Sequence, residues 1–359
     1  MNSTFGKNIR LSVFGESHGP AIGVVIDGLP AGVMLDFDKI NMHMARRAPG
    51  KSVHATPRKE EDKVQICSGI MDGGVTTGAP LCAMIENTNK RSGDYVNMTH
   101  VPRPGHSDYS AIVKYGGFAD LRGGGHFSGR LTAPLVFAGS VCRQILQDRG
   151  IRIVSHIASI GGVQDVSFAD RMPNDDEIKT LNTQTFPVMD SEKCALMQEH
   201  MDRVRLQNDS CGGVVECAAI GMPIGIGSHM FRSVESILSG LFFSIPAVKG
   251  VEFGAGFTTA NMQGSENNDA YICDGDRVTT KTNHSGGILG GMTTGMPVIA
   301  RLAFKPTPSI AKMQNSVNLQ TKQPQTLEIQ GRHDPCILSR AAVVAESMMA
   351  IGLLELLGD

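Results

Sequence analysis

The sequence predicts an α+β fold built from a duplicated β-α-β-β unit, and three observations support this prediction. The pattern Gly-x-Pro-x-Gly follows an apolar stretch twice, at residues 28–32 and 221–225. The pattern Gly-Gly-x-Thr-Thr-Gly-x-Pro also occurs twice, at 73–80 and 290–297, and each time it leads into an apolar stretch. A segment with apolar residues at helical spacing lies between the two patterns in each copy. Two fused copies of one unit would pack into a single pseudo-symmetric body.

The predicted elements follow one another in the same order in both copies. The first copy, about residues 20–86, has strand 21–26, helix 36–47 and strands 63–67 and 81–85. A further strand, 10–14, precedes it. The second copy, about 213–304, has a strand from 213, helix 232–243 and strands 248–253 and 298–304. Matching glycines are 193 residues apart in the first pattern and 217 apart in the second. The second copy is therefore longer by 24 residues, and we expect this insertion between Gly254 and Gly286.

The remaining segments link or follow the two copies. Residue spacing predicts helix 133–148, strand 151–160, a polar loop at 165–189 and helix 191–206. The last segment, 340–357, is apolar on most sides and is expected to be a buried helix. With 359 residues and 41% hydrophobic content, the chain is expected to form one domain that spans residues 1–359.

Charge is nearly balanced, with 33 lysines and arginines against 35 aspartates and glutamates. The chain therefore has no global field that would hold nucleic acid or an anionic membrane, and an anionic ligand must be bound by a local basic cluster. The N-terminal segment 1–15 lacks the apolar core of a signal peptide, and no apolar stretch has the length of a membrane helix. We expect a soluble, cytoplasmic protein.

Eight cysteines are present, and no two of them form a Cys-x-x-Cys pair. Cys82, Cys142 and Cys217 lie inside apolar runs, where cysteine packs as a small buried hydrophobic residue. We expect free thiols and no metal site.

The first candidate catalytic group is His18, in the segment Gly15 to Gly19 at the end of the first strand. A histidine between glycines is poorly shielded by neighbouring side chains, so a bound substrate can reach its imidazole. On these residues alone, a turn with a surface histidine is the simpler interpretation.

A second candidate is His106, in the run Arg103-Pro104-Gly105-His106-Ser107-Asp108. Histidine moves protons near neutral pH, and the arginine adds an anion-binding group on the same turn. The run also fits a helix N-terminus capped by Ser107 or Asp108, and the two interpretations are compatible.

Three consecutive glycines lie in the segment Arg122 to Arg130 and are followed by His126, Phe127 and Ser128. Placed before the next predicted helix, their backbone amides would form an anion site at a helix N-terminus. A merely flexible loop is the alternative.

Further basic segments are candidates for binding anions. Arg46 and Arg47 end the first predicted helix, where they would also complement the helix dipole. The segment Lys305 to Ser309 combines a cation with two hydroxyl groups in a loop stiffened by two prolines, which suits a phosphate. Arg332 and Asp334 follow between a glycine and a proline, either in a fixed loop or as a surface ion pair.

Three segments resemble the signatures of the chorismate synthase family: residues 15–30, the glycine run with the histidine turn before it, and the segment 331–346. The resemblance extends over nearly the whole chain and is weakest at 165–206. The chain departs from the family pattern at four positions. The family has arginine and serine where this chain has His126 and Phe127, and basic residues where it has Ala48 and Val53.

The resemblance implies a fold and a reaction. The family fold is a sandwich of helices between antiparallel sheets, assembled as a homotetramer. Its members are lyases that convert 5-enolpyruvylshikimate 3-phosphate into chorismate and phosphate by an anti-1,4-elimination, the last common step of the shikimate pathway to aromatic amino acids. The reaction needs reduced FMN although no net redox change occurs, and NADPH is a candidate reductant of the flavin.

The resemblance also implies roles for residues at matching positions. His18 would protonate the leaving phosphate, His106 would keep the flavin in its useful protonation state, and Asp334 would assist proton transfer at the flavin N5. The substrate or NADP would be bound by Ser17, Arg46, Arg47, Arg103 and Arg130. FMN would be bound by His126, Phe127, Ser128, Ala247, Gly290, Lys305, Pro306, Thr307, Pro308, Ser309 and Arg332.

Two other functions remain open on the sequence. A metal-dependent hydrolase would use His18, His106, His333 and Asp334, but these residues lack a recognised metal-ligand spacing. A non-catalytic or regulatory protein that binds flavin or anions on the same fold would explain the departures in the glycine run. Neither a nucleic-acid partner nor a membrane partner is indicated.

Overall fold

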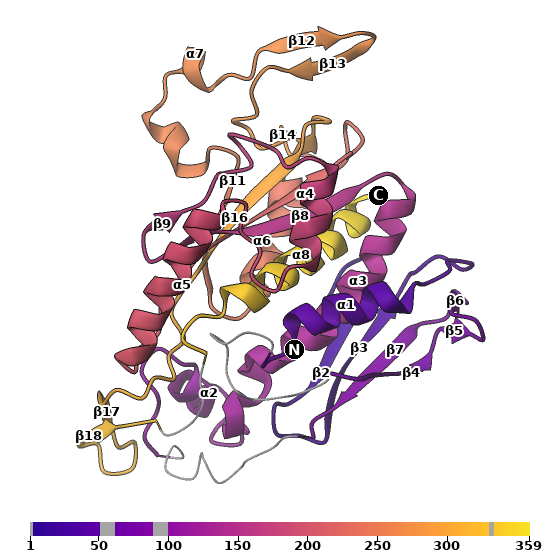
Figure 1. Ribbon diagram of the computed structural model, residues 1–359. Helices are drawn as coiled ribbons and strands as arrows, with labels where there is room; N and C mark the ends of the chain where they lie inside the picture. The colour runs from indigo at the N-terminus through magenta and orange to yellow at the C-terminus, as the bar shows by residue number, and fades with distance from the viewer. Residues whose placement is uncertain (1–2, 51–61, 89–99, 330–333) are drawn as a thin grey trace.

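Two antiparallel five-stranded sheets enclose a layer of helices in the computed structural model of the chain (Figure 1). The structure describes residues 3–50, 62–88, 100–329 and 334–359. In Figure 1 the first sheet lies at the lower right and the second at the upper left, with α1, α3 and α8 between them. This arrangement confirms the predicted α+β sandwich.

The first sheet has the strand order β1-β2-β3-β7-β4, with every neighbouring pair antiparallel. Its central strand β3 is rich in β-branched residues, and Ile22, Val24 and Ile26 alternate along it into the core. The strands are β1 Thr4–Phe5, β2 Arg10–Gly15, β3 Ala21–Asp27, β4 Val64–Ser68 and β7 Leu81–Glu86, and a separate hairpin has β5 Ile70–Met71 and β6 Val75–Thr76.

The second sheet has the order β11-β16-β10-β8-β9 and is also antiparallel. Its part β10-β16-β11 repeats the order β3-β7-β4 of the first sheet. In addition, β8 pairs with β10 as β2 pairs with β3, so the strand that the sequence places between the copies belongs to the second sheet. The strands are β8 Arg152–Ile160, β9 Val163–Gln164, β10 Gly213–Ile220, β11 Val248–Phe253 and β16 Val298–Phe304.

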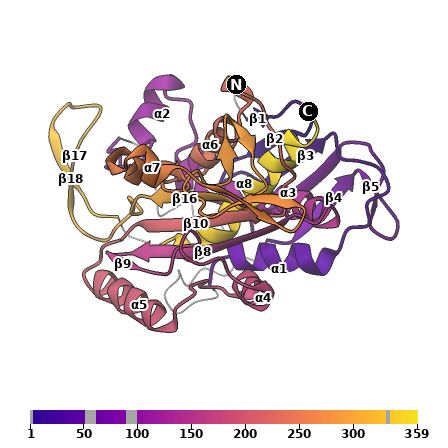
Figure 2. The same cartoon turned by 90° about the horizontal axis from the view of Figure 1, so that it is seen from above.

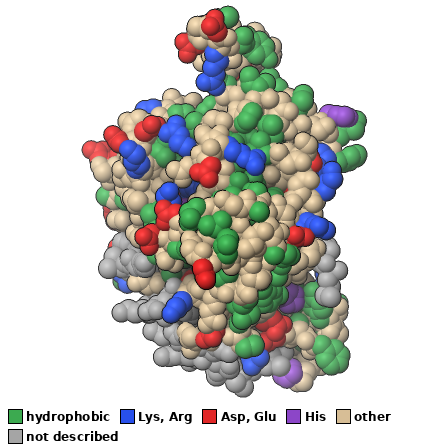
Figure 3. All heavy atoms as spheres, turned by 90° about the vertical axis from the view of Figure 1, so that its right-hand side faces the viewer, with side chains coloured by type: hydrophobic (Ala, Val, Ile, Leu, Met, Phe, Trp, Pro, Cys, Tyr) green, Lys and Arg blue, Asp and Glu red, His purple; other side chains and the backbone are tan. Residues whose placement is uncertain are grey.

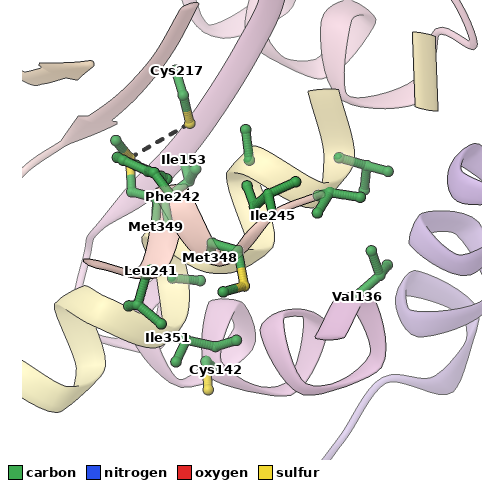
Figure 4. Packing of buried hydrophobic residues seen from close by; sticks show 14 of the residues in the cluster. Val136, Cys142, Ile153, Cys217, Leu241, Phe242, Ile245, Met348, Met349 and Ile351 are labelled. Carbon is green, nitrogen blue, oxygen red and sulfur yellow. Dashed lines mark hydrogen bonds between the residues drawn. The ribbon is translucent and has the colours of Figure 1, made fainter. Parts of the chain in front are cut away.

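Four helices fill the space between the sheets: α1 Phe37–Arg47, α3 Thr132–Asp148, α6 Val234–Ser244 and α8 Leu338–Leu356. Every residue of α8 except Ser339 and Arg340 is buried, which confirms the predicted buried helix at the C-terminal end. Figure 4 shows Met349 of α8 and Phe242 of α6 in this interior, where the Cys217 thiol lies 3.5 Å from the Met349 sulfur. The core therefore joins both sheets through one layer of helices.

The predicted insertion between Gly254 and Gly286 projects from the body at the top of Figure 1. It contains η5 Gly256–Asn261, α7 Gly264–Asn267 and a hairpin of β12 Tyr271–Asp274 and β13 Arg277–Thr280. The carboxylate of Asp269 fixes its base by accepting bonds from the backbone N–H groups of His284 and Ser285. Two more hairpins follow: β14 Ile288–Leu289 with β15 Met292–Thr293, and β17 Gln314–Val317 with β18 Pro324–Leu327.

Acidic and basic side chains are interspersed over the face shown in Figure 3. This distribution agrees with the nearly balanced charge of the sequence. Within the described ranges, no helix combines the length and the apolar character that crossing a membrane requires.

The predicted loop at 165–189 contains a helix, so this prediction was wrong for part of the segment. The helix is α4 Asp175–Thr183, and it begins with a capping box between Asn174 and Glu177. Only two of its nine side chains are buried, and two apolar positions are too few to predict a helix from periodicity. The next helix, α5 Ser191–Leu206, has the predicted bounds. Figure 2 shows α4 and α5 along the same side of the second sheet.

A buried histidine joins the segment around α4 to the second sheet. His156 lies on β8, with Nδ1 2.8 Å from Asp165 Oδ2 and Nε2 2.9 Å from Glu216 Oε2. Both carboxylates also accept bonds from backbone N–H groups that flank α4. Burial alone would lower the pKa of His156, but the hydrogen bonds and charges of Asp165 and Glu216 outweigh burial and raise this pKa above 6.5.

We expect the protein to lose stability as the pH rises above about 6.5. Because the folded-state pKa of His156 is raised, its contribution is fully present below the unfolded-state pKa and is lost as the pH rises through the folded-state pKa. Urea unfolding at about pH 6 and about pH 9 measures this loss. A His156→Gln variant should be less stable than the wild type at the lower pH and should lack the difference between the two pH values. Parallel pH dependences would contradict the assignment.

Candidate active site

The loop that carries His18 follows β2 and is held by backbone hydrogen bonds. Ser17 N donates to Gly125 O at 3.1 Å, and Gly19 N donates to Glu16 O at 3.0 Å. The His18 residue is only 8% exposed. The structure therefore places this imidazole inside a site, which argues against a turn with a surface histidine.

His106 lies in a tightly bonded turn before α2 Asp108–Lys114. Its Nδ1 is 2.5 Å from Asp108 Oδ1, and Arg103 donates to the same carboxylate through Nε and Nη2 at 2.7 Å each. Burial alone would raise the pKa of Asp108, but bonds and charge from Arg103 and His106 hold this pKa well below its usual range. We assign the Nδ1 proton to the bond with Asp108, so Nε2 is the ring nitrogen that does not face this carboxylate. Ser107 makes no side-chain capping bond.

The glycine run brings the two histidines together. Gly123 and Gly124 have φ values of 58° and 86°. A Cβ atom on Gly123 would lie 2.3 Å from Cε1 of His18, and one on Gly124 would lie 3.1 Å from Cε1 and Nε2 of His106. Both imidazoles therefore pack against adjacent backbone units, in space that any side chain there would fill.

The glycine run does not begin a long helix, so its predicted placement at a helix N-terminus is wrong. The glycines lie in the 3₁₀ turn η2 Arg122–Phe127, which a second turn, η3 Gly129–Leu131, separates from α3. Their left-handed φ values do not continue into the α3 helix. The glycines instead give the imidazoles room.

The segment Lys305 to Ser309 lies against the turn of His106. Lys305 Nζ donates to the carbonyl oxygen of Gly105, and Arg103 Nη1 donates to Ser309 Oγ at 3.3 Å. Burial, together with the nearby charge of Lys249, lowers the pKa of Lys305 below 10.5. Two neighbouring ammonium groups and a hydroxyl group make this loop suitable for an anion.

Asp334 lies at the other side of the same loop. Thr307 Oγ1 donates to the Asp334 carbonyl at 3.0 Å, and Arg340 Nη1 donates to Asp334 Oδ2 at 2.6 Å. Arg340 Nε also donates to the backbone carbonyl of Arg47 at 2.8 Å. Arg340 on α8 therefore joins Asp334 to the end of α1.

Arg47 and Arg130 share one buried carboxylate. Asp62 Oδ2 lies 3.3 Å from Arg47 Nη1, and Asp62 Oδ1 accepts a bond from Arg130 Nη1. Arg130 Nε donates to Asn87 Oδ1 at 3.0 Å. The shared carboxylate reduces the cost of burying two guanidinium groups side by side.

Arg46 does not join this cluster. Its Nη1 and Nη2 donate to the two oxygens of Glu346 on α8, at 2.8 and 2.9 Å, and both side chains are buried. Arg143 and Ser155 donate to the same carboxylate. The guanidinium of Arg46 is therefore paired within the core, and we leave Arg46 out of the proposed binding site.

His126 and Phe127 form an aromatic cluster with Tyr115. The His126 and Phe127 ring centroids are 4.1 Å apart, and His126 Nε2 lies 3.3 Å from the Tyr115 hydroxyl. Ser128 is the N-cap of η3 and accepts a bond from Arg130 N at 3.3 Å. The aromatic side chains of His126 and Phe127 lie directly after the glycines that contact His18 and His106.

The predicted FMN positions are not all brought together within one chain. Lys305 N donates to Ala247 O at 3.0 Å, so Ala247 lies beside the cationic loop. Gly290 lies between β14 and β15, and Figure 1 places β14 at the opposite end of the molecule from α2. Arg332 and the departure at Val53 lie outside the described residues.

Several contacting residues were not among the predicted site residues, among them Asp62, Asn87, Lys249 and Arg340. Asp62 directly precedes the predicted strand 63–67, and Asn87 lies two residues after the predicted strand 81–85; polar residues at strand ends are a signal that could have indicated both. Lys249 lies within a strand, where its sequence context resembles that of any surface cation, whereas Arg340 lies inside the segment 331–346 that resembles a family signature.

Comparisons with known proteins agree on one family. The family model described as chorismate synthase matches residues 9–357. A protein named chorismate synthase from Methanococcoides burtonii is 45% identical over 353 residues, which cover 98% of this chain and 95% of that protein. One of the same name from Dehalococcoides mccartyi strain BAV1 is 43% identical over 361 residues, which cover 99% of this chain and 96% of that protein.

A solved structure agrees with these matches. A crystal structure of chorismate synthase aligns with a TM-score of 0.77 and 29% sequence identity, and the alignment covers 98% of this chain and 92% of that one. Fold, length and sequence all match along the whole chain. The chain therefore belongs to the chorismate synthase family, and it is a lyase of aromatic biosynthesis.

Proposed function

We propose that the enzyme catalyses the anti-1,4-elimination of phosphate from 5-enolpyruvylshikimate 3-phosphate, giving chorismate, with reduced FMN bound. The observation that carries this proposal is the contact of His18 and His106 with adjacent glycines, beside the cationic loop that begins at Lys305. In this elimination the substrate ring loses a proton and its phosphate departs. A histidine next to an anion site can protonate the departing phosphate, and a second histidine together with Asp334 can handle the proton that the ring loses.

The substrate carries two carboxylates and a phosphate, so burying it requires several guanidinium groups. Arg47, Arg103 and Arg130 are the proposed ligands within the described residues, together with Ser17, and Arg332 remains a proposed ligand outside them. Each of the three described arginines contacts Asp62 or Asp108. These carboxylates limit repulsion among the arginines before the substrate arrives.

The residues also fit FMN. Lys305, Lys249 and Ser309 offer cations and a hydroxyl group for its phosphate, and the cluster of His126 and Phe127 offers flat faces for its ring. Bound in reduced form, FMN would supply electron density as the phosphate leaves. NADPH is the proposed reductant.

The proton-handling groups have separate proposed roles. His18, held in the loop after β2, protonates the departing phosphate. His106, oriented by Asp108 at Nδ1, would use Nε2 to maintain the protonation state of bound flavin. Asp334, held by Arg340, would move a proton at the flavin N5 when FMN is bound.

A cytoplasmic homotetramer is part of the proposal. Gly290 lies next to β14, at the opposite end of the molecule from α2 and the His106 turn. A second copy would therefore have to bring Gly290 to the flavin. Light scattering on the purified protein measures the mass, and a monomer at working concentration would contradict this assembly.

Anaerobic assay with photoreduced FMN tests the function. We expect chorismate and phosphate to form in equal amounts, and neither to form when FMN is omitted or left oxidised. Binding of FMN and substrate without turnover would instead favour the non-catalytic homologue. Turnover that requires an added divalent metal and no flavin would contradict the proposal.

A Gly123→Ala variant is expected to lower kcat by roughly 10- to 100-fold, because its new methyl group would displace the His18 ring. The left-handed φ of 58° also strains any residue other than glycine. Gly129→Ala is the matched control, since a Cβ atom there meets nothing within 4 Å. The control should retain its activity, and a wild-type kcat in Gly123→Ala would remove the packing argument.

A further inference from the structure

Asn87 is a buried amide directly after β7 that contacts the loop of His18. Its Nδ2 donates to Glu16 O at 2.9 Å and to Gly19 O at 3.0 Å. Its backbone N donates to Pro20 O at 3.1 Å. These three bonds span the loop, and His18 lies inside the span.

The carbonyl end of the same amide contacts an arginine. Asn87 Oδ1 accepts from Arg130 Nε at 3.0 Å, and Arg130 also donates to the Asp62 carboxylate and, at 3.4 Å, to Glu86 O. One side chain thus fixes the loop of a candidate acid and the orientation of a candidate anion-binding group. The two groups are linked by a single rigid amide.

An amide suits this position because it combines two N–H donors with an acceptor. A carboxylate has no donor when ionised, and it would place a negative oxygen beside the carbonyls of Glu16 and Gly19. The opposite side of the loop is held by the bond from Ser17 N to Gly125 O. The loop is therefore clamped between Asn87 and the glycine run.

We propose that Asn87 is a positioning residue, which sets the place of the His18 imidazole and couples it to anion binding at Arg130. This inference rests on the proposed elimination for its effect on turnover. Asn87 acts through the two residues that it holds, so its loss should reduce the rate of the bound complex more than it weakens binding. A misplacement of about 1 Å in a catalytic group can reduce turnover about 100-fold.

An Asn87→Asp variant tests the proposal, because it keeps the shape and removes both donors. We expect kcat to fall roughly 10- to 100-fold, with KM changed by less than about 5-fold. Gln144→Glu is the matched control: Gln144 is another buried amide, on α3, and it bonds at 2.7 and 3.1 Å to the backbone of Asp36. The control should keep its kcat. A wild-type kcat in Asn87→Asp, or equal losses in both variants, would overturn the proposal.

A second measurement does not depend on turnover. The ring resonances of His18, assigned with a His18→Gln variant, should move in Asn87→Asp and stay unchanged in Gln144→Glu. If the wild type makes no chorismate while these resonances move, the elimination fails and the positioning role stands. Unmoved His18 resonances in Asn87→Asp would overturn the positioning role. If Asn87→Asp does not fold, Asn87→Ser, which keeps one donor, takes its place in both measurements.

Discussion

Replacing His18 or His106 by alanine is expected to lower kcat by roughly 10²- to 10⁴-fold, the usual range for losing a general acid or base. Both rings contact the glycine run in the candidate active site. The fold should survive, because both histidines lie in loops outside the helices and strands. The measurement is the anaerobic formation of chorismate at saturating substrate and reduced FMN.

His229→Ala is the matched control, since His229 is an exposed histidine that precedes the turn before α6. It should turn over like the wild type. Urea unfolding of each variant separates a catalytic loss from a loss of folded protein. Near-normal turnover in either His18→Ala or His106→Ala would remove that residue from the mechanism.

The duplicated fold could be predicted because its turns demand particular residues. Gly73 and Gly74 before β6, like Gly290 and Gly291 before β15, have left-handed φ values that favour glycine, so both copies keep the same pattern. Helices α3 and α8 occupy the same place in the order of the two copies, but no repeated sequence pattern predicts this. Each follows the last strand of its copy, but a buried helix needs only apolar residues, which many sequences supply.

The site could be predicted only in part, because its contacts join distant segments. The neighbouring glycines indicated His18 and His106 as candidates. That the two imidazoles lie against Gly123 and Gly124 depends on how the sheets and helices pack. Arg46 and Arg47 show the limit most clearly. They are adjacent in the chain, yet successive helical residues point about 100° apart, so one faces Glu346 in the core and the other faces Asp62.

The buried carboxylate of Glu346 pairs with two arginines within the helix layer. Arg46 and Arg143 both donate to it, Ser155 adds a bond of 2.6 Å, and His43 lies close to Arg143. Burial alone would raise the pKa of Glu346, but the charges of the two arginines outweigh burial and lower it from 4.5 to about 2. Burial and the charge of Arg143 lower the pKa of His43 to about 3, so His43 adds no positive charge near neutral pH.

A Glu346→Ala variant is therefore expected to lose about 3–5 kcal/mol of unfolding free energy, because two buried guanidinium groups lose the carboxylate that faces them. Replacing Glu346, Arg46 and Arg143 together by methionine should recover much of this loss, since no charge is then buried. Arg152→Ala is the matched control: its ion pair with Asp175 is exposed and should contribute about 0–1 kcal/mol.

The pH dependence of unfolding gives an independent check on Glu346. Its folded-state pKa is lowered, so its contribution is present above the unfolded-state value of about 4.5 and is lost as the pH falls toward about 2. The wild type should lose stability steeply over this range, and the triple methionine variant should lose less. If Glu346→Ala unfolds at the same urea concentration as the wild type near neutral pH, the cluster does not hold the helix layer together. A large loss in Glu346→Ala that the triple variant recovers would show that the cost lies in leaving the buried arginines without their carboxylate.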